Sequence, residues 1–208
     1  MANLQQIVDE VKATTRRYSQ DDFITHRVKM AVKHIHSRDF FPMDRVEIII
    51  PNVDLTLAST GLIGQFPIPS RWRTFETVRP LDSDNQLIGK RWEGITPQEI
   101  ESRRRLGLDV DTYYVAGQQG NFKSSVAVYQ LLISYFVNPN LTPAVGETLE
   151  DISTWITDSW EEAVHDLACA FVYGATGNQE QKNNYMLTYR EHHEPDILRS
   201  YSYSSVQR

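Results

Sequence analysis

The spacing of apolar residues changes twice along the chain, and this change constrains the fold more than any single motif does. From residue 3 to residue 37, apolar side chains recur every three or four positions, as they do in amphipathic helices. From Arg45 onward, apolar and polar residues alternate, as in strands with one buried face. In the last third, the helical spacing returns. Neither helical part can bury its apolar stripe alone. We therefore expect an α+β protein in which the N- and C-terminal helices form one bundle and a β-rich subdomain is inserted between them.

These changes divide the chain into four expected segments. Residues 1–42 are the N-terminal part of the helical bundle, and residues 43–140 are the β-rich insertion, which carries one short helix. Residues 141–195 are the C-terminal part of the bundle. Residues 196–208 form an extended C-terminal tail, because serine and tyrosine alternate near its end without a packing stripe.

Short-range signals place the individual elements. Ser19 and Asp158 are the expected N-caps of the second helix and of the longest C-terminal helix. Thr96-Pro97-Gln98-Glu99 is a capping box with proline at the first helical position, and Gly107 ends that short helix. The last helix is expected to stop before Pro195. The expected strands are 45–50, 53–57, 72–78, 86–92, 112–116 and 126–136, with turns at 67–70, 82–85 and 117–121.

The composition excludes several classes of protein. The 208 residues include 21 basic and 27 acidic side chains, and the net charge of −6 argues against a DNA-wrapping or polybasic membrane protein. A single cysteine, Cys169, excludes an intramolecular disulfide framework and a cysteine-rich zinc site. The first ten residues do not resemble a signal peptide, and the longest apolar stretch, 129–137, is too short for a membrane helix. We expect a soluble protein that does not bind membranes.

Two patterns resemble catalytic motifs without completing them. Glu162 and His165 have the helical spacing of carboxylate-bridged metal sites, but such sites need a second copy of the pair on a partner helix. The segment 117–124 resembles a phosphate-binding loop, yet two residues separate Gly120 from Lys123, and a strand follows. We expect a hairpin turn there, and neither a catalytic residue, a metal nor a cofactor in the chain. A small metal-dependent hydrolase that uses Glu162 and His165 remains the alternative of a different class.

Charge is distributed unevenly along the helical parts. No lysine or arginine lies between Ser124 and Gln181, whereas basic residues outnumber acidic ones between Arg16 and Arg45. The two sets of charges can pair within one molecule or head to tail between copies, and head-to-tail contacts close into rings; scattered solvated charge is the third possibility. The candidate acidic face, between subunits or toward a lumen, is Glu147, Glu150, Asp151, Asp158, Glu161, Glu162 and Asp166. The candidate inter-subunit basic face is Arg16, Arg17, Arg27, Lys29 and Lys33.

The order of these features resembles the head-to-tail adaptor (connector) proteins of tailed bacteriophages, particularly the short-tailed ones. The resemblance covers most of the chain and consists of a diffuse pattern of segments, without a catalytic signature. It begins with the opening helix pair and Phe40-Phe41-Pro42-Met43-Asp44, and ends with Ile133 to Pro139 leading into acidic helices. Between them stand Pro67 to Arg73 and the succession of a helix at 95–101, a tyrosine-rich strand and a glycine turn at 113–117.

The resemblance implies a structural virion protein that is not an enzyme. Such a protein forms a homo-oligomeric ring, usually of twelve copies, below the portal protein in the neck between capsid and tail. The ring extends the DNA channel used in genome ejection and offers a surface to tail nozzle or tail-tube proteins. Duplex DNA passes through its lumen without sequence-specific binding, and the acidic segment would repel the phosphates. The protein would be made in the host cytoplasm. Another neck or tail-completion protein, such as a stopper, is the alternative within this class.

The C-terminal tail is the expected portal-binding segment. Its candidate contact residues are Ile197, Leu198, Arg199, Tyr201 and Tyr203. Ten extended residues reach roughly 33 Å, and alternating serine and tyrosine suit strand addition at the edge of a sheet. The alternative is a disordered terminus.

Overall fold

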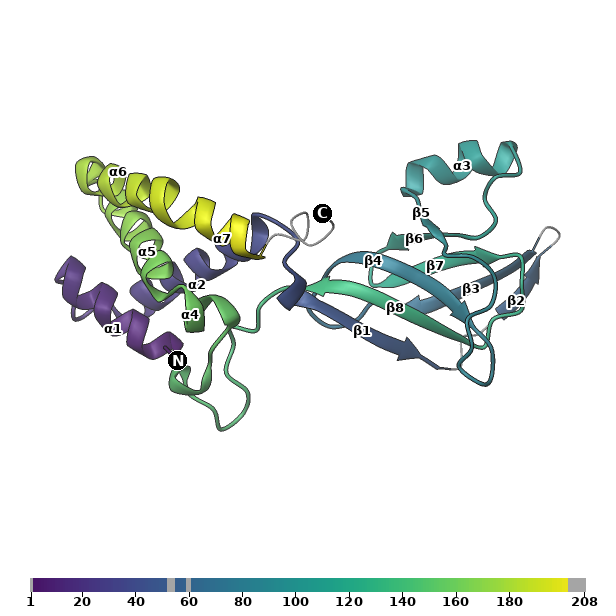
Figure 1. The fold of residues 1–208 in the computed structure, drawn as a ribbon, viewed down its shortest axis with the longest axis horizontal. Helices are drawn as coiled ribbons and strands as arrows, with labels where there is room; N and C mark the ends of the chain where they lie inside the picture. Colours follow the sequence, from purple (N-terminus) through teal and green to yellow (C-terminus); the bar gives the residue numbers. More distant parts are fainter. Residues whose placement is uncertain (1, 52–54, 59–60, 202–208) are drawn as a thin grey trace. The chain divides into compact units, whose positions relative to one another are not determined.

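The computed structural model describes residues 2–51, 55–58 and 61–201 and has the predicted α+β class (Figure 1). The described chain forms two compact units. The helical unit comprises Met1–Asp44 and Asn138–Arg208, and the β unit comprises Arg45–Val137. The sequence placed the ends of the insertion at residues 43 and 140, two and three residues outside this β unit.

The helical unit is a bundle around a central helix, α5. Its helices are α1 (Leu4–Thr15), α2 (Asp21–Ser37), α4 (Trp155–Ser159), α5 (Glu161–Ala175), α6 (Gln179–Thr188) and α7 (Glu194–Tyr201). Helix α5 packs against α1, α2, α4 and α6, so both ends of the chain contribute to one core. Its stripe of apolar residues is fully buried, from Ala163 and Val164 to Val172. The N- and C-terminal parts are also joined where the Leu4 N–H donates to the Ile152 carbonyl at 2.9 Å.

Two predicted helix caps are wrong. Helix α2 begins at Asp21 after Gln20, not after Ser19, because Arg16 in the left-handed conformation (φ 55°) ends α1 and a short loop follows. Asp158 lies inside α4, and α5 begins after Trp160, whose N–H bonds to the Ile156 carbonyl of that short helix. The sequence therefore missed that two helices meet end to end at this point.

The predicted helix end at Pro195 and the extended tail after it are also wrong. A proline ring in a regular α-helix clashes with the carbonyl four residues earlier. Here a π-helical turn, Tyr189–His193, precedes the proline, and its wider backbone lets the helix continue as α7. Ile197 is buried in the core of the helical unit, and Leu198 packs against that core. Residues 196–201 are therefore part of the bundle.

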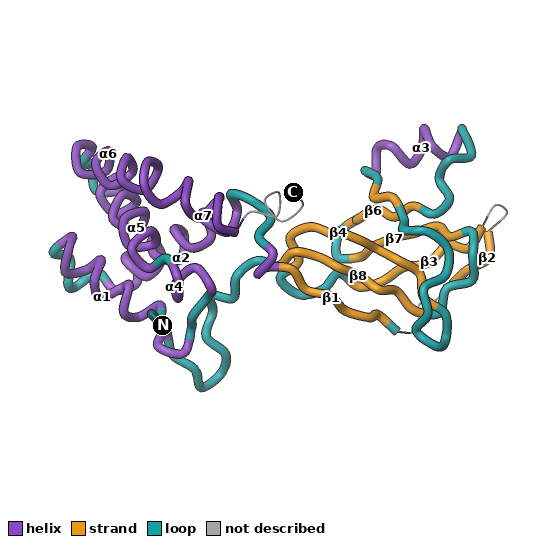
Figure 2. Tube along the Cα trace, in the orientation of Figure 1, coloured by secondary structure: helices purple, strands orange, loops and turns teal. Residues whose placement is uncertain are grey.

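The β unit contains two sheets (Figure 2). The three-stranded sheet has the antiparallel order β1 (Arg45–Ile50), β8 (Gln130–Val137), β4 (Trp72–Leu81). The five-stranded sheet has the order β2 (Leu55–Ala58), β3 (Gly61–Pro67), β7 (Gln119–Ser124), β6 (Thr112–Ala116), β5 (Glu93–Gly94), and only the β5–β6 pair is parallel. Their core is rich in aromatic side chains, including Phe122, which stacks on Trp92 at 4.6 Å between ring centroids.

The strand predictions are partly confirmed. Strands β1, β4, β6 and β8 occupy predicted segments. Strand β2, Leu55–Ala58, overlaps the predicted strand 53–57 and ends one residue later, and residues 53 and 54 of that prediction lie outside the described residues. Strands β3 and β7 were not predicted, and the turn expected at 117–121 is shorter. The predicted strand 86–92 is a loop that runs beside β4, with the Ile88 and Trp92 N–H groups donating to the Pro80 and Val78 carbonyls.

Helix α3 (Pro97–Arg105) stands between β5 and β6 and has the predicted ends. The backbone N–H and the hydroxyl of Thr96 both donate to the Glu99 carboxylate, at 2.7 and 2.8 Å. Gly107 follows the helix with a φ of 69°. None of the residues of α3 is buried, so its conformation depends on its caps rather than on a core. Among the described residues, no helix is both long enough and apolar enough to cross a bilayer.

Candidate interaction surfaces

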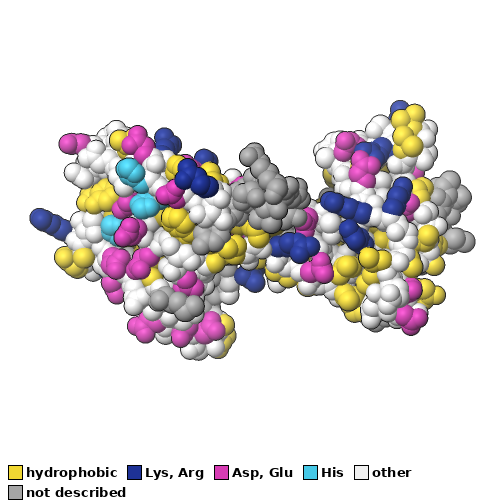
Figure 3. All heavy atoms as spheres, viewed as in Figure 1, with side chains coloured by type: hydrophobic (Ala, Val, Ile, Leu, Met, Phe, Trp, Pro, Cys, Tyr) yellow, Lys and Arg dark blue, Asp and Glu magenta, His cyan; other side chains and the backbone are white. Residues whose placement is uncertain are grey.

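The net charge of the protein belongs to the helical unit. The β unit has ten basic and ten acidic residues, whereas the helical unit has 11 basic and 17 acidic ones. Acidic and histidine side chains gather on the face of the helical unit that Figure 3 shows. A surface that attracts or repels charged partners through its net charge is therefore a property of the helical unit.

Three of the predicted acidic residues share one cleft. Glu161, Glu162 and Asp166 of α5 line it together with Glu10 and Thr14 of α1. Burial raises the pKa of Glu161, and the carboxylates of Glu10 and Glu162 raise it further. Sequence reasoning missed Glu10 because the residue lies on α1, far from the acidic C-terminal segment that supplied the candidate residues. The only available signal was its place on the polar face of α1.

Asp166 joins two histidines in the same region. Its Oδ1 and Oδ2 atoms accept from His165 Nδ1 and His193 Nε2, both at 3.1 Å. Burial raises the pKa of Asp166, but the hydrogen bonds from the two rings lower it by more, so the carboxyl is more acidic than usual. The Thr14 hydroxyl lies 3.0 Å from His165 Nε2 and ties α1 to this group.

The proposed metal pair Glu162 and His165 does not form a recognisable centre. Both ring nitrogens of His165 contact other groups, namely Asp166, Thr14 and Cys169, while Glu162 is exposed. Cys169 is fully buried beside this ring, and burial, with a smaller effect of Asp166, raises its pKa to about 12. Within the described parts of the chain, no group of three histidine, cysteine or acidic side chains is placed to hold a metal ion.

The other predicted acidic residues have local structural roles or lie apart from the cleft residues. The Asp151 carboxylate caps the 3-10 turn Leu149–Asp151 by accepting from the Thr148 N–H at 2.8 Å. Glu150 is exposed beside it, and Asp158 lies in α4. Glu147 closes a tight turn that begins at Ala144. The predicted acidic face thus divides into one cleft, one acidic loop segment and Asp158 in α4.

The turn at residues 144–147 presents an apolar side chain. The Glu147 N–H donates to the Ala144 carbonyl at 3.0 Å, and the Ala144 N–H donates to the Glu147 carboxylate at 2.8 Å. Gly146 has a φ of 92°, a conformation that favours glycine. Val145 is completely exposed, with a relative accessibility of 107%. We call this segment, Ala144–Glu147, the valine turn.

The predicted basic residues do not form a single face. Arg16 and Arg17 lie just beyond the end of α1, where an Arg17 guanidinium nitrogen donates to Gln20 at 3.2 Å. On α2, Arg27 stacks over the Phe23 ring at 4.9 Å. Lys29 lies about 200° round the helix from Arg27 and shares its side with Lys33. The structure therefore separates these five residues into at least three groups.

The predicted portal-binding residues are divided in the same way. Ile197 belongs to the core and is not available as a contact, and Leu198 is half-buried against that core. Arg199 is exposed and contacts Asp196 at 3.3 Å. The backbone of Tyr201 ends α7. Tyr203 lies outside the described residues.

The β unit carries a groove that the sequence did not suggest. It has a volume of about 600 Å³ and lies between α3 and the outer side of β3, β6 and β7. Ile63, Ile95, Ile100 and Val110 supply apolar walls, and Arg104 and Lys123 supply positive charge. Lys123 is paired with the buried Asp109 at 2.7 Å, and this pair lowers the pKa of the carboxyl. We call this the α3 groove.

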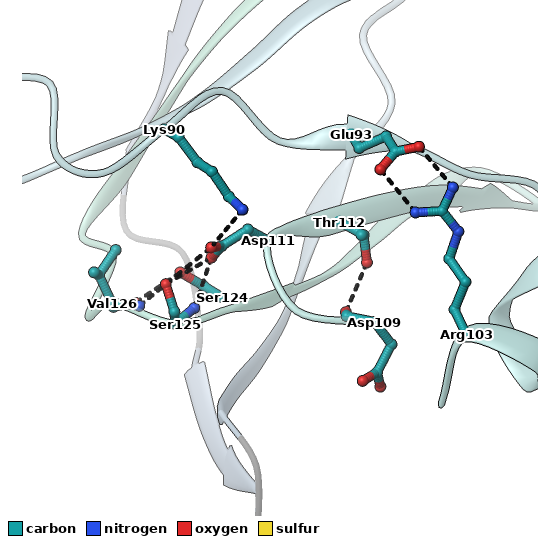
Figure 4. Close-up of polar contacts among 9 residues, drawn as sticks. All are labelled: Lys90, Glu93, Arg103, Asp109, Asp111, Thr112, Ser124, Ser125 and Val126. Carbon is teal, nitrogen blue, oxygen red and sulfur yellow. Dashed lines mark hydrogen bonds and ion pairs between the residues drawn. The ribbon is translucent and has the colours of Figure 1, made fainter. Parts of the chain in front are cut away.

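Ion pairs fix the segments around the α3 groove (Figure 4). Arg103 makes two parallel bonds to the Glu93 carboxylate, at 2.6 and 2.7 Å, and so ties α3 to β5. Asp111 accepts from the Ser125 N–H at 2.8 Å and faces Lys90 at 3.6 Å. The loop before β6 is therefore held at both ends, and the groove is a formed feature of the β unit. No sequence signal pointed to it, because it brings Ile63 of β3 beside the consecutive elements α3, β6 and β7.

Comparison with protein-family models gives no match, and comparison with curated proteins gives none either.

Proposed function

We propose that this protein is a structural component of a bacteriophage particle, namely a head-to-tail adaptor that forms a ring below the portal. The ring extends the DNA channel and offers a surface to tail proteins in the neck of the virion. The proposal rests on the sequence resemblance together with the surface chemistry of the two units.

The charge distribution of the helical unit is the observation that carries the proposal. The whole net charge of −6 belongs to this unit. Its acidic cleft is built by α1 and α5, while exposed basic residues such as Lys33 lie on α2. Unlike charges on different surface patches favour head-to-tail contacts between copies, and such contacts close into rings.

The acidic excess also suits a wall beside passing DNA. Phosphates are repelled by carboxylates such as Glu10, Glu161 and Glu162, so a duplex would slide along such a wall without binding to it. We expect the purified protein to retain no duplex DNA at moderate salt, as measured by fluorescence anisotropy with a labelled duplex of random sequence.

The decisive experiment is electron microscopy with light scattering on the full chain, alone and mixed with the portal protein of the same phage. A ring seated on the narrow end of the portal is expected. A persistent monomer that ignores the portal would overturn the proposal, and a ring that binds only to an assembled tail would favour a stopper instead.

Charge variants sharpen this experiment. The double variant Glu161→Lys and Glu162→Lys changes the cleft, and Glu180→Lys with Glu191→Lys makes the same charge change at exposed positions of α6 and the π-helical turn. Ring formation on the portal should weaken in the first variant and persist in the second. Equal behaviour of the two variants would remove the acidic cleft from the proposal.

The portal contact of the C-terminus is proposed only for the segment beyond α7. Because α7 runs to Tyr201, deletion from residue 199 would shorten the helix that carries the buried Ile197. Deletion of residues 202–208, including Tyr203, is the appropriate test. We expect weaker portal binding with an unchanged melting temperature; unchanged binding would exclude this segment as the contact.

A further inference from the structure

We propose that the valine turn of one copy inserts into the α3 groove of a second copy. This inference deepens the proposed function, since it rests on self-association of the chain and names the two surfaces that meet.

The first observation is the valine turn itself. A fully exposed apolar residue at the tip of a loop gains nothing from the fold of its own unit, and here the tip is held in one conformation by two reciprocal hydrogen bonds between Ala144 and Glu147.

The rigidity of the valine turn matters for binding. A flexible loop loses conformational entropy when it docks, whereas a preformed turn has already lost it on folding. The bond from the Ala144 N–H to Glu147 and the glycine conformation at Gly146 (φ 92°) both restrict the turn. Val145 is therefore presented in a conformation suited to a complementary apolar recess.

The second observation is the α3 groove. Its volume of about 600 Å³ lies in the range that accommodates a small ligand, so it is large enough for a valine with its adjoining backbone. Ile63 is 43% exposed on the groove wall, and Ile100 of α3 is partly exposed opposite the sheet. An apolar wall left open to solvent is typical of a docking surface.

Charge selects a second copy as the occupant. Behind Val145 the chain is acidic, with Glu147 and Glu150 exposed and no basic residue between Ser124 and Gln181. The α3 groove has the opposite character, because Arg104 lines it in addition to the Lys123–Asp109 ion pair. The turn and the groove are thus complementary in both polarity and charge.

The turn and the groove are different surfaces, so two copies either exchange them reciprocally in a two-fold dimer or join head to tail; the ring of the proposed function requires the head-to-tail, heterologous contact. A heterologous contact leaves one turn and one groove unused in every dimer and continues until a ring closes or a filament grows. The inference therefore predicts that each copy in the ring donates one valine turn and accepts another.

Disulfide trapping tests this contact directly. The only native thiol, Cys169, is fully buried, so only the introduced cysteines would form disulfides. The test variant carries Val145→Cys and Ile63→Cys in one chain. The control carries Val145→Cys and Leu87→Cys, because Leu87 is also exposed on the β unit, at 54%, but lies outside the groove. Both variants are oxidised, alone and with the portal protein, and their covalent multimers are compared on non-reducing gels.

A ladder of covalent multimers in the test variant, and not in the control, is the expected result. Two bridged residues need Cα atoms within about 7 Å, so a ladder would place the turn in the groove. No ladder in samples that form rings by microscopy would overturn the contact and leave the proposed function standing. A ladder without any portal binding would support the contact and overturn the adaptor.

A second variant tests the energetics without cysteines. Val145→Asp places a charge in the apolar recess and should weaken self-association about tenfold or more, which sedimentation measures. Because Val145 is completely exposed, the melting temperature of the Val145→Asp variant should equal that of the wild type. Leu87→Asp is the matched control and should associate normally. Normal association of Val145→Asp would contradict the inference.

Discussion

Gly120 and Phe66 face each other across β7 and β3, and the phenyl ring occupies the space above the glycine. The two residues are paired in the register of these strands. A Cβ atom on Gly120 would lie 2.1 Å from the Phe66 Cζ atom, far inside van der Waals contact. Because Phe66 is itself 1% exposed, the ring has no free space into which it can move. The glycine is therefore required for the packing of the β unit.

This pairing predicts a specific pattern of stability. Gly120→Ala should destabilise the protein by about 1–3 kcal/mol, since it forces the aromatic ring out of a packed core. Adding Phe66→Leu should recover part of that loss, because the smaller side chain leaves room for the methyl group. Urea denaturation of the two single variants and the double variant measures this coupling. Strictly additive effects would mean that the two side chains do not compete for space.

A buried acceptor in the helical unit gives a second prediction. Asp44 is 3% exposed and accepts from His36 Nδ1 at 2.8 Å and from Trp155 Nε1 at 2.9 Å. Asp44→Ala removes the acceptor of the buried His36 ring and of the half-buried Trp155 indole, and should cost about 2–4 kcal/mol. Asp44→Asn keeps one carbonyl oxygen and should cost less. Chemical denaturation followed by tryptophan fluorescence will report both, and equal costs would argue against a hydrogen-bonding role.

The acidity of Asp166 makes part of the stability dependent on pH. Its pKa in the folded protein is depressed, because hydrogen bonds from His165 and His193 outweigh the effect of burial. A carboxyl group whose pKa is lower in the folded than in the unfolded state stabilises the fold at pH values above its unfolded pKa of about 3.9. That stabilisation is lost as the pH falls through the pKa of the folded state. Melting temperatures between pH 2.5 and pH 6 should thus fall more steeply for the wild type than for Asp166→Asn. Parallel curves would exclude this contribution.

The helical C-terminus gives a fourth prediction. Ile197 is 1% exposed in the core of the helical unit, so Ile197→Ala should cost about 2–5 kcal/mol. Arg199→Ala, two residues later at an exposed position, should change stability by less than about 0.5 kcal/mol. Thermal denaturation distinguishes these values. Similar, small effects of both substitutions would mean that the segment after Pro195 does not pack as α7.

Periodicity and capping could be predicted from the sequence where local chemistry determines the structure. The stripes of α1 and α2 and the Thr96 capping box need no distant partner to be recognised, and the structure has them. Strands β3 and β7 were missed because Gly64 and Gly120 look like turn residues, although Gly120 is needed opposite Phe66. Pro195 looked like a helix end because a π-helical turn has no simple sequence signal.

The candidate surfaces were less accessible from the sequence than the fold. The acidic residues of α5 were identified, but their partner Glu10 comes from α1, about 150 positions away. The α3 groove combines Ile63, Ile100 and Lys123, and nothing in the local sequence of any one of them indicates the others. Such sites are set by strand order and helix placement, which short-range patterns do not determine.

The confinement of net charge to the helical unit has a practical consequence for handling the protein. A positively charged resin will attract the unit with 17 acidic and 11 basic residues, while the β unit, with ten of each, has no net attraction to it. Molecules adsorbed in this way would share one orientation and keep the β unit exposed to solution. Immobilised chains would then offer an α3 groove to soluble copies, even though their own acidic surface is occupied by the resin.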